Sequence, residues 1–379
     1  MAVTTVQSNN NLVQFTRDIN REFIRQNMFS PFMGPGLNAI IRLRQEPKKG
    51  GEVMNIPLVT KLTGKGVGRG PLVGNEEKID NYGMRLWIDW ARHAVVSTDA
   101  EKHKDDGLVF EEARPMLSDW GRELQRDELV EAFMALPSET SPVAHSSDDG
   151  DRVNGIRWEA STATQRNAFG AANSDRILFG NAVSNYNATF ATALGNVDTT
   201  NDKLTGSSVS LLERIAEQAS PSIRPYSLRD GYETYVLFVG TNTYRDLYED
   251  LKTVHMNAQV RGSNNPLFRP GDLEYGNVLI RKVPQISTYV SNVWTDLKTA
   301  GNSSSRVEPV FLAGQQAAVL GWGQMAKPVT RKEDDYGFVD GRGISMAYGV
   351  GKMFKKHPMD GTSLKQWGVV TGFFSAAAD

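Results

Sequence analysis

Apolar and polar residues alternate along two segments that flank a glycine-rich stretch. Residues 52–62 and residues 84–97 each show a period of two, which predicts two strands. Pro57 lacks a backbone N–H and favours an edge position for the first strand. The second is predicted to be continuous, with one apolar face. That face consists of Leu86, Ile88, Trp90, Ala94 and Val96.

The residues between these strands, 61–83, have neither a helical nor a strand period. Loops longer than about 12–15 residues are uncommon inside compact domains and are often functional. We therefore expect residues 51–97 to form an extended two-stranded loop whose end is rich in glycine.

Glycine and basic residues in the segment 61–74, KLTGKGVGRGPLVG, raise the possibility of a phosphate-binding loop. The spacing does not match a dinucleotide fingerprint or a P-loop. The residues after the segment have no apolar period and predict no helix, so the N-terminal N–H groups that bind a phosphate would be missing. An enzyme that binds a nucleotide or phosphate through this loop is therefore the least favoured hypothesis.

The strongest helical pattern covers residues 107–136 and ends before Pro137. Its apolar stripe includes Ala113, Met116, Leu117, Trp120 and Leu124. From residue 116 to residue 136 such a helix would be about 30 Å long. We expect a long helix that carries charged residues on its outer face.

The rest of the chain mixes helices and strands without a regular alternation, which predicts the α+β class. Short helices are predicted at 207–220, 241–251 and 313–323. Strands are predicted at 232–240, 276–284, 307–314, 343–356 and 366–375.

Residues 1–50 are predicted to form an arm, in which seven basic residues outnumber three acidic ones. Two interpretations are open: a solvated, partly helical lead-in, or an arm that contacts a neighbouring subunit or faces a polyanion. The candidate polyanion-facing residues are Arg17, Arg21, Arg25, Arg42 and Arg44.

Composition narrows the class of protein. With 379 residues, of which 40% are hydrophobic and 23% charged, the chain is expected to fold into two or three globular domains. A net charge of −2 argues against a protein that mainly grips DNA. The absence of cysteine excludes disulfides and thiolate sites. The polar first residues predict no signal peptide, and no apolar run is long enough to span a membrane.

Three short motifs resemble functional sites, but each lacks a required part. Ser345 in GISMA is followed by a strand pattern, whereas a nucleophile elbow requires a helix. The acidic segment 148–155 lacks the ligand spacing of a calcium loop. Asp334, Asp335 and Asp340 favour a polar turn or an inter-subunit contact over a cation site. With no paired histidines either, we expect no enzyme activity, cofactor or metal.

The order of these elements resembles the major capsid proteins of tailed bacteriophages, which have the Hong Kong 97-type fold. The similarity is greatest to the capsid family typified by the Schitoviridae. It is carried by residues 235–251 (YVLFVGTNTYRDLYEDL), 265–284 (NPLFRPGDLEYGNVLIRKVP), 310–324 (VFLAGQQAAVLGWGQ) and 332–356 (KEDDYGFVDGRGISMAYGVGKMFKK).

This resemblance implies a division of the chain into functional parts. They are an N-terminal arm (1–50), an extended loop (51–97), a peripheral domain (98–224) with a spine helix near 107–136, an axial domain (225–345) and closing strands (346–379). Copies would assemble in the bacterial host cytoplasm as hexamers and pentamers of an icosahedral virion capsid around double-stranded DNA. Portal, scaffold and decoration proteins would be the other partners, and no membrane would be involved.

Under this hypothesis the glycine-rich loop reaches a neighbouring subunit. Glycine lets it bend between assembly states, and charged residues pair across the contact. The candidate inter-subunit residues are Lys61, Lys65, Arg69, Glu76, Glu77, Asp334 and Asp335. An encapsulin-like nanocompartment shell of the same fold is the alternative.

Overall fold

A computed structural model describes ten parts of the chain: residues 27–45, 52–59, 62, 64–77, 81–104, 108–229, 232–259, 272–331, 335–356 and 363–376. The described residues belong to two compact units. One contains Arg92–Glu123 and Lys327–Ser345, and the other contains Asn27–Ala91, Leu124–Ala326 and Met346–Asp379. Helices and strands are mixed in the manner of the α+β class, as predicted.

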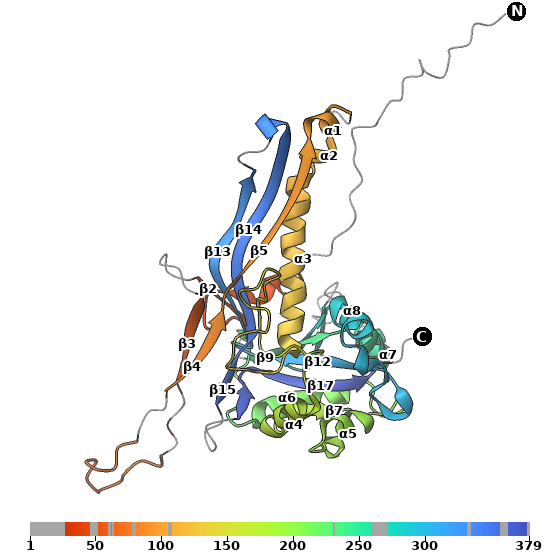
Figure 1. Cartoon of the computed structure of the whole chain (residues 1–379). Helices are drawn as coiled ribbons and strands as arrows, with labels where there is room; N and C mark the ends of the chain where they lie inside the picture. Colours follow the sequence, from red (N-terminus) through yellow and green to blue (C-terminus); the bar gives the residue numbers. More distant parts are fainter. Residues whose placement is uncertain are drawn as a thin grey trace, which may run out of the picture. The chain divides into compact units, whose positions relative to one another are not determined.

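A seven-stranded mixed sheet forms the core of the larger unit (Figure 1). Its order is β10 (Asp272–Tyr275), β11 (Val278–Lys282), β9 (Tyr232–Val239), β12 (Val307–Ala313), β17 (Val369–Ser375) and β7 (Ile177–Phe179), with β8 (Ser227–Arg229) added beside β9. The β9–β11 and β7–β17 pairs are parallel, whereas β12 is antiparallel to both of its neighbours. All residues of β12 and β17 are buried, as expected for strands covered on both faces.

Five helices belong to the same unit: α4 (Ala163–Ala172), α5 (Phe190–Gly195), α6 (Gly206–Gln218), α7 (Thr241–Gln259) and α8 (Pro284–Asn292). Figure 1 shows α4, α5 and α6 below β17 in this view. Helix α6 begins with a capping box between Thr205 and Ser208. It packs against β12 and β17 through Val209, Leu212 and Ala216.

Aromatic rings cluster on one face of this sheet, since its register places Phe373, Phe179, Phe311 and Phe238 on the same side. Phe373 contacts Phe179, Phe190 and Trp158. Farther along the same face, Phe133 packs against Phe29, Phe238 and Phe311. Such rings bury large apolar areas and contribute directional contacts, so they hold the helices to the sheet.

A six-stranded sheet has the order β1 (Met33–Gly34), β2 (Ile41–Gln45), β13 (Ala318–Thr330), β14 (Val339–Lys352) and β5 (Asp89–Thr98), with β6 (Val153–Asn154) beside β14. Strands β5, β13 and β14 and helix α3 (Ala113–Met134) each have residues in both units. Two short pairs complete the strands: β3 (Val53–Val59) with β4 (Asn81–Trp87), and β15 (Phe354–Lys356) with β16 (Leu364–Gln366).

The smaller unit also contains α1 (Asp99–Lys104), α2 (Leu108–Glu111) and the 3₁₀ turn η7 (Asp335–Gly337). Lys102 forms an ion pair with Asp340 at 2.8 Å. The centroid of the Phe110 ring lies 4.8 Å from the Lys102 ammonium and 4.6 Å from the Arg342 guanidinium. These cation–π contacts attach α1 and α2 to β14.

The predicted strand 84–97 is wrong in one respect, because it consists of two strands. β4 pairs with β3 and β5 joins the six-stranded sheet, so the chain changes sheet at Ile88. Burial shifts phase at the same point: Ile88 and Asp89 are both buried, and Trp90, predicted on the apolar face, is 52% exposed. A sheet change of this kind depends on distant partners that a local period does not reveal.

The helix predicted at 313–323 is also wrong. Residues 318–322 begin β13 and pair in parallel with Ile41–Gln45 of β2. Ala317, Ala318 and Val319 are completely buried, and Gln316 has a positive φ of 55°. Helix propensity is a weak preference that tertiary pairing overrides here.

The remaining predictions of helices and strands are confirmed with adjusted ends. The long helix is α3, preceded by α2, although Met116 of the predicted stripe is 57% exposed. The segments at 207–220, 232–240, 241–251, 276–284, 307–314, 343–356 and 366–375 match α6, β9, α7, β11, β12, β14 with β15, and β17.

Candidate assembly site

The β3–β4 hairpin is attached to the larger unit by one apolar face. Its register places Pro57 opposite Gly83 and Ile56 opposite Met84. Every second residue of β3 is buried, as the period-two pattern predicted. The buried side chains pack against β13, β14 and β15. The cluster contains Met54, Ile56, Leu58, Met84, Leu86, Ile88, Val319, Ala347, Met353 and Phe354.

Polar groups that the sequence analysis missed hold the root of the hairpin, where β4 ends and β5 begins. Asp89 is 6% exposed, and its Oδ2 accepts hydrogen bonds from the backbone N–H groups of Ser146, at 3.1 Å, and Asp151, at 2.9 Å. The His145 Nδ1 lies 3.7 Å from the same oxygen. A buried carboxylate costs much free energy unless hydrogen-bond donors such as these N–H groups bind it. The sequence did contain a signal for this buried group, because Asp89 lies between Trp87 and Trp90 in an apolar run.

Arg152 and Glu128 form a buried ion pair beside this root. The Arg152 Nε lies 2.7 Å from Glu128 Oε1, and Nη1 donates to the Trp90 carbonyl at 2.8 Å. Burial raises the pKa of Glu128 although the guanidinium opposes this shift. The pair therefore links α3 to the first residues of β5, and removal of one partner would leave a buried charge.

The segment 64–77, hereafter the hairpin loop, is exposed except for the half-buried Val67. Figure 1 shows it beyond the ends of β3 and β4. Its own acids brace it: Glu77 accepts from the Gly64 N–H at 2.7 Å, and Glu76 accepts from the Gly74 N–H at 2.7 Å. No helix follows the loop, because β4 comes next in the described chain. The prediction that no helix follows the glycine-rich segment is therefore confirmed for the described residues, and a helix N-terminus of this kind is what a phosphate-binding loop requires.

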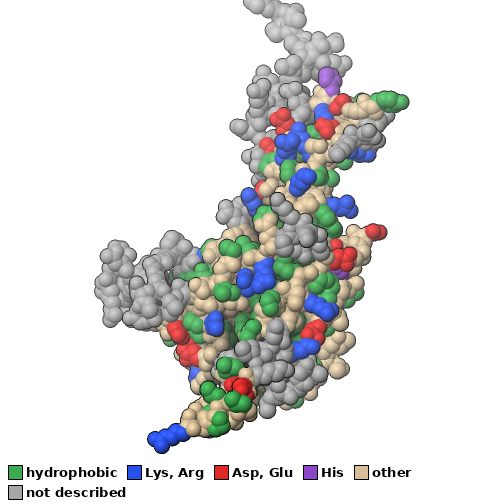
Figure 2. Space-filling model, turned by 90° about the vertical axis from the view of Figure 1, so that its left-hand side faces the viewer, with side chains coloured by type: hydrophobic (Ala, Val, Ile, Leu, Met, Phe, Trp, Pro, Cys, Tyr) green, Lys and Arg blue, Asp and Glu red, His purple; other side chains and the backbone are tan. Residues whose placement is uncertain are grey.

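The predicted contact residues have different positions. Lys65 and Arg69 are exposed on the hairpin loop and form no ion pair within the described chain, whereas Glu76 and Glu77 bind the loop's own backbone. Figure 2 shows hydrophobic and basic side chains together at the end of this segment, at the bottom of the view. Asp335 begins η7. Lys61 and Asp334 lie outside the described residues.

Of the arginines predicted to face a polyanion, Arg42 and Arg44 lie on β2, and residues 27–45 pack within the larger unit. The two side chains are on the same face of the strand because they are two residues apart. Burial, and next the Arg42 charge, lower the pKa of Arg44. Neither forms an ion pair with a described residue. Arg17, Arg21 and Arg25 lie outside the described residues.

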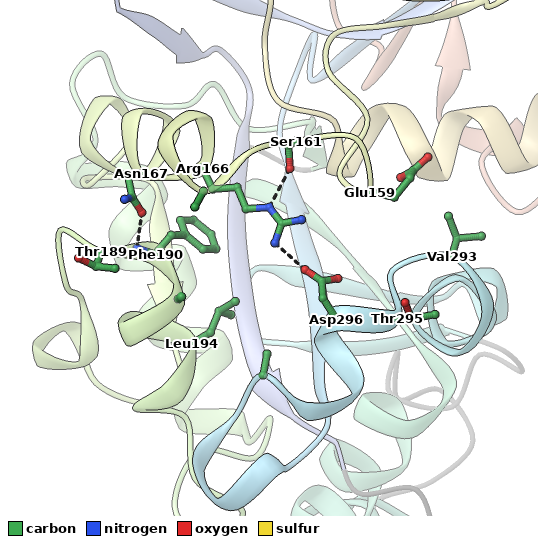
Figure 3. A pocket seen from close by; sticks show the side chains of 13 residues that line it. Glu159, Ser161, Arg166, Asn167, Thr189, Phe190, Leu194, Val293, Thr295 and Asp296 are labelled. Atoms are coloured by element: carbon green, nitrogen blue, oxygen red, sulfur yellow. Dashed lines mark hydrogen bonds and ion pairs between the residues drawn. The ribbon is translucent and has the colours of Figure 1, made fainter.

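A cavity of about 460 Å³ opens beside α4, α5 and the 3₁₀ segment η5 (Thr295–Thr299). Figure 3 shows the Arg166 side chain reaching from α4 to Ser161 and Asp296. Its Nε donates to Ser161 Oγ at 2.7 Å, and Nη1 pairs with Asp296. The guanidinium also lies 4.0 Å from the Trp158 ring centroid. Apolar side chains, among them Phe190, Leu194 and Val293, form much of the wall.

The Asp, Glu and His residues of the described chain include no group of three that could hold a metal ion. The described helices include none both long and apolar enough to cross a membrane. Ser345, the residue of the rejected elbow, lies within β14 and is buried.

Comparison with known proteins identifies the chain's relatives. The family model for phage capsid protein matches residues 3–371. The capsid protein of cyanophage Pam1 is 32% identical over 100% of both chains, with a TM-score of 0.84. The capsid of Ralstonia phage GP4 is 18% identical over 100% of this chain and 99% of that one, with a TM-score of 0.69.

A third solved structure, the head of Helicobacter pylori bacteriophage KHP40, has 12% identity and a TM-score of 0.65. The alignment covers 98% of this chain and 96% of that one. Comparison with curated protein sequences gives no match.

Proposed function

The chain belongs to the phage capsid protein family, and from this premise we propose that its β3–β4 hairpin and hairpin loop bind a neighbouring copy in the shell. The protein is a major capsid protein of the Hong Kong 97-type fold, forms the icosahedral shell of the virion by self-association, and is not an enzyme. A nanocompartment shell is not favoured, because the matching family and structures are phage capsids.

The observation that carries the proposed contact is the exposure of the hairpin loop. Lys65 and Arg69 have no acidic partner among the described residues, and Leu72 and Val73 are 70% and 84% exposed. Exposed apolar residues beside unpaired charges are typical of a surface that is buried in an assembly. Acidic residues of the neighbouring copy would supply the opposite charge to these cations, and Asp334 and Asp335 are candidates for a separate inter-subunit contact.

We extend the proposal to the shell's organisation. Hexamers and pentamers form from the hairpin and arm contacts and enclose double-stranded DNA in the host cytoplasm. Portal, scaffold and decoration proteins are the further partners. The division into arm, extended loop, peripheral domain, axial domain and closing strands, at the boundaries predicted above, is part of this proposal.

Arg42 and Arg44 support a local contact with the packaged DNA. Both residues lie on strand β2, and neither forms an ion pair with an acidic residue of the described chain. Arginine binds phosphate through several N–H donors, and each such contact adds to the salt dependence of binding. The overall charge of −2 keeps such contacts few.

Expression of the full chain, alone and together with a scaffold protein, tests the main proposal. We expect capsid-sized particles in negative-stain images and a fast-sedimenting fraction. Changing Lys65 and Arg69 together to Glu should reduce that fraction, whereas changing Lys252 to Glu should not, since Lys252 pairs with Glu249 at an exposed position on helix α7. Equal particle yields from both variants would refute the role of the hairpin loop.

A further inference from the structure

We propose that the cavity beside α4 and α5 receives the apolar end of the hairpin loop of a second copy. Leu72 and Val73 would enter the cavity, while Lys65 and Arg69 would lie at its acidic rim. This inference rests on the proposed function, since it requires the loop to bind a neighbour. It goes further by naming the surface of the neighbour that the loop binds.

The apolar end is presented by a loop that is already folded. The Asn75 N–H donates to the Leu72 carbonyl at 3.0 Å, and Gly74 has a φ of +87°, so these residues form a tight turn with Val73 near its apex. The Asn75 side chain also donates to the Pro71 carbonyl at 3.0 Å. A preorganised turn loses little entropy when it binds, which favours its use as an anchor.

The cavity has the properties that such an anchor requires. Its wall includes the apolar side chains of Phe190, Leu194 and Val293, and its volume is in the range of natural binding pockets. The guanidinium of Arg166 is already bonded to Ser161, Asp296 and the Trp158 carbonyl. An apolar side chain can therefore fill the cavity without separating Arg166 from its partners.

Charge at the rim matches the loop. Glu159 lines the cavity, is exposed and forms no ion pair in the described chain, and the Asp296 side chain is 42% exposed beside Arg166. On the loop, Lys65 and Arg69 are exposed and precede the turn in sequence. Opposite charges at a rim steer association and select the register of the contact.

The symmetry of the contact also fits a shell. The apolar turn and the cavity are different surfaces of one chain, so each copy offers one surface to the next copy. Such heterologous contacts generate closed rings when the rotation between copies allows it. A contact of this kind suits the five- and six-membered rings of an icosahedral shell.

The absence of native cysteine makes a disulfide test specific. In the full-length protein, Val73→Cys is combined with Ala191→Cys, an exposed cavity residue on α5. The matched control combines Val73→Cys with Ala168→Cys, which is also exposed, on α4, but does not line the cavity. After oxidation of assembled shells, we expect ladders of linked subunits on non-reducing gels from the first pair and monomers from the control.

The outcomes separate the two proposals. Shells that form normally but give no ladder, or the same ladder with both pairs, would overturn the cavity as the docking site and leave the proposed function intact. Failure of the wild-type chain to form shells with its scaffold would instead count against the proposed function.

A charge exchange gives a second readout that does not depend on disulfide geometry. Arg69→Glu or Glu159→Arg alone should raise the subunit concentration required for assembly by up to about fivefold, the factor for one exposed ion pair. The double variant should recover part of that loss. If the effects of the two changes simply add, Arg69 and Glu159 are not in contact, and that part of the proposal is wrong.

Discussion

The side-chain amide of Asn154 forms two hydrogen bonds with the backbone of Trp87, as the backbone of a neighbouring β-strand would. The Trp87 N–H donates to Asn154 Oδ1 at 2.8 Å, and Asn154 Nδ2 donates to the Trp87 carbonyl at 3.0 Å. Trp87 is the last residue of β4, so these hydrogen bonds hold the root of the hairpin at the point where the chain passes from β4 to β5. One side chain thereby satisfies two backbone groups that would otherwise lose their partners.

Replacing Asn154 with Ala should destabilise the larger unit by about 1–3 kcal/mol, because a buried donor and acceptor lose their partners. Chemical denaturation of the unassembled subunit measures the loss, and hydrogen exchange should show faster exchange at the Trp87 amide. Asn154→Asp keeps the acceptor for that amide and serves as the control. If Trp87 exchanges equally in both variants, the Asn154 pair does not hold the root.

Gly349 should not tolerate a side chain. A Cβ at this position would lie 2.0 Å from the Trp87 carbonyl oxygen, a backbone atom that cannot move without displacing β4. We expect Gly349→Ala to lower the free energy of unfolding by about 1–3 kcal/mol or more. Gly68→Ala is the matched control, since nothing lies within 4 Å of its Cβ, and it should change stability by less than about 0.5 kcal/mol.

Glu77 should determine the order of the hairpin loop. Its carboxylate accepts the Gly64 N–H across the loop, so Glu77→Ala should speed hydrogen exchange at Gly64 in the unassembled subunit. Glu77→Gln keeps an acceptor oxygen and should preserve most of the protection. Because the loop is exposed, neither variant should change global stability by more than about 0.5 kcal/mol. Unchanged exchange in the Ala variant would contradict the bracing role.

Lys352 should make stability depend on pH above neutrality. Its Nζ donates to the Phe133 carbonyl at 3.0 Å and lies 5.1 Å from the Phe169 ring centroid. Burial lowers the pKa of Lys352 from 10.5 to about 7. Between these values the unfolded chain binds the proton and the folded chain does not, so this group's contribution to stability rises with pH.

Lys352→Met should remove this pH dependence. The difference in unfolding free energy between the variant and the wild type should shrink by up to about 1.4 kcal/mol per pH unit from pH 7 to pH 10. The variant should be the more stable protein at pH 7, where the wild type must bury or discharge an ammonium group. A difference that is constant over this range would show that Lys352 does not titrate there.

The local pattern of the sequence determined much of this protein. The alternation of apolar and polar residues along 52–62 specified the buried face of β3. A strand that packs through one face alternates buried and exposed side chains, because successive side chains point to opposite faces. Helix α6 followed from its apolar stripe. The spacing of the glycines in 61–74, with no helix after them, was enough to exclude a phosphate loop.

Tertiary structure decided where the chain changes partner. Residues 84–97 have one period but enter two sheets, since Asn154 and Asp89 hold the chain at a break that no local pattern marks. Residues 318–322 became a buried strand because β2, nearly 280 residues earlier, supplies their hydrogen bonds. The cavity likewise joins α4, α5 and η5, and its lining is set by packing between segments distant in sequence. Such pairings depend on the whole fold, whereas periodicity reports only on neighbours along the chain.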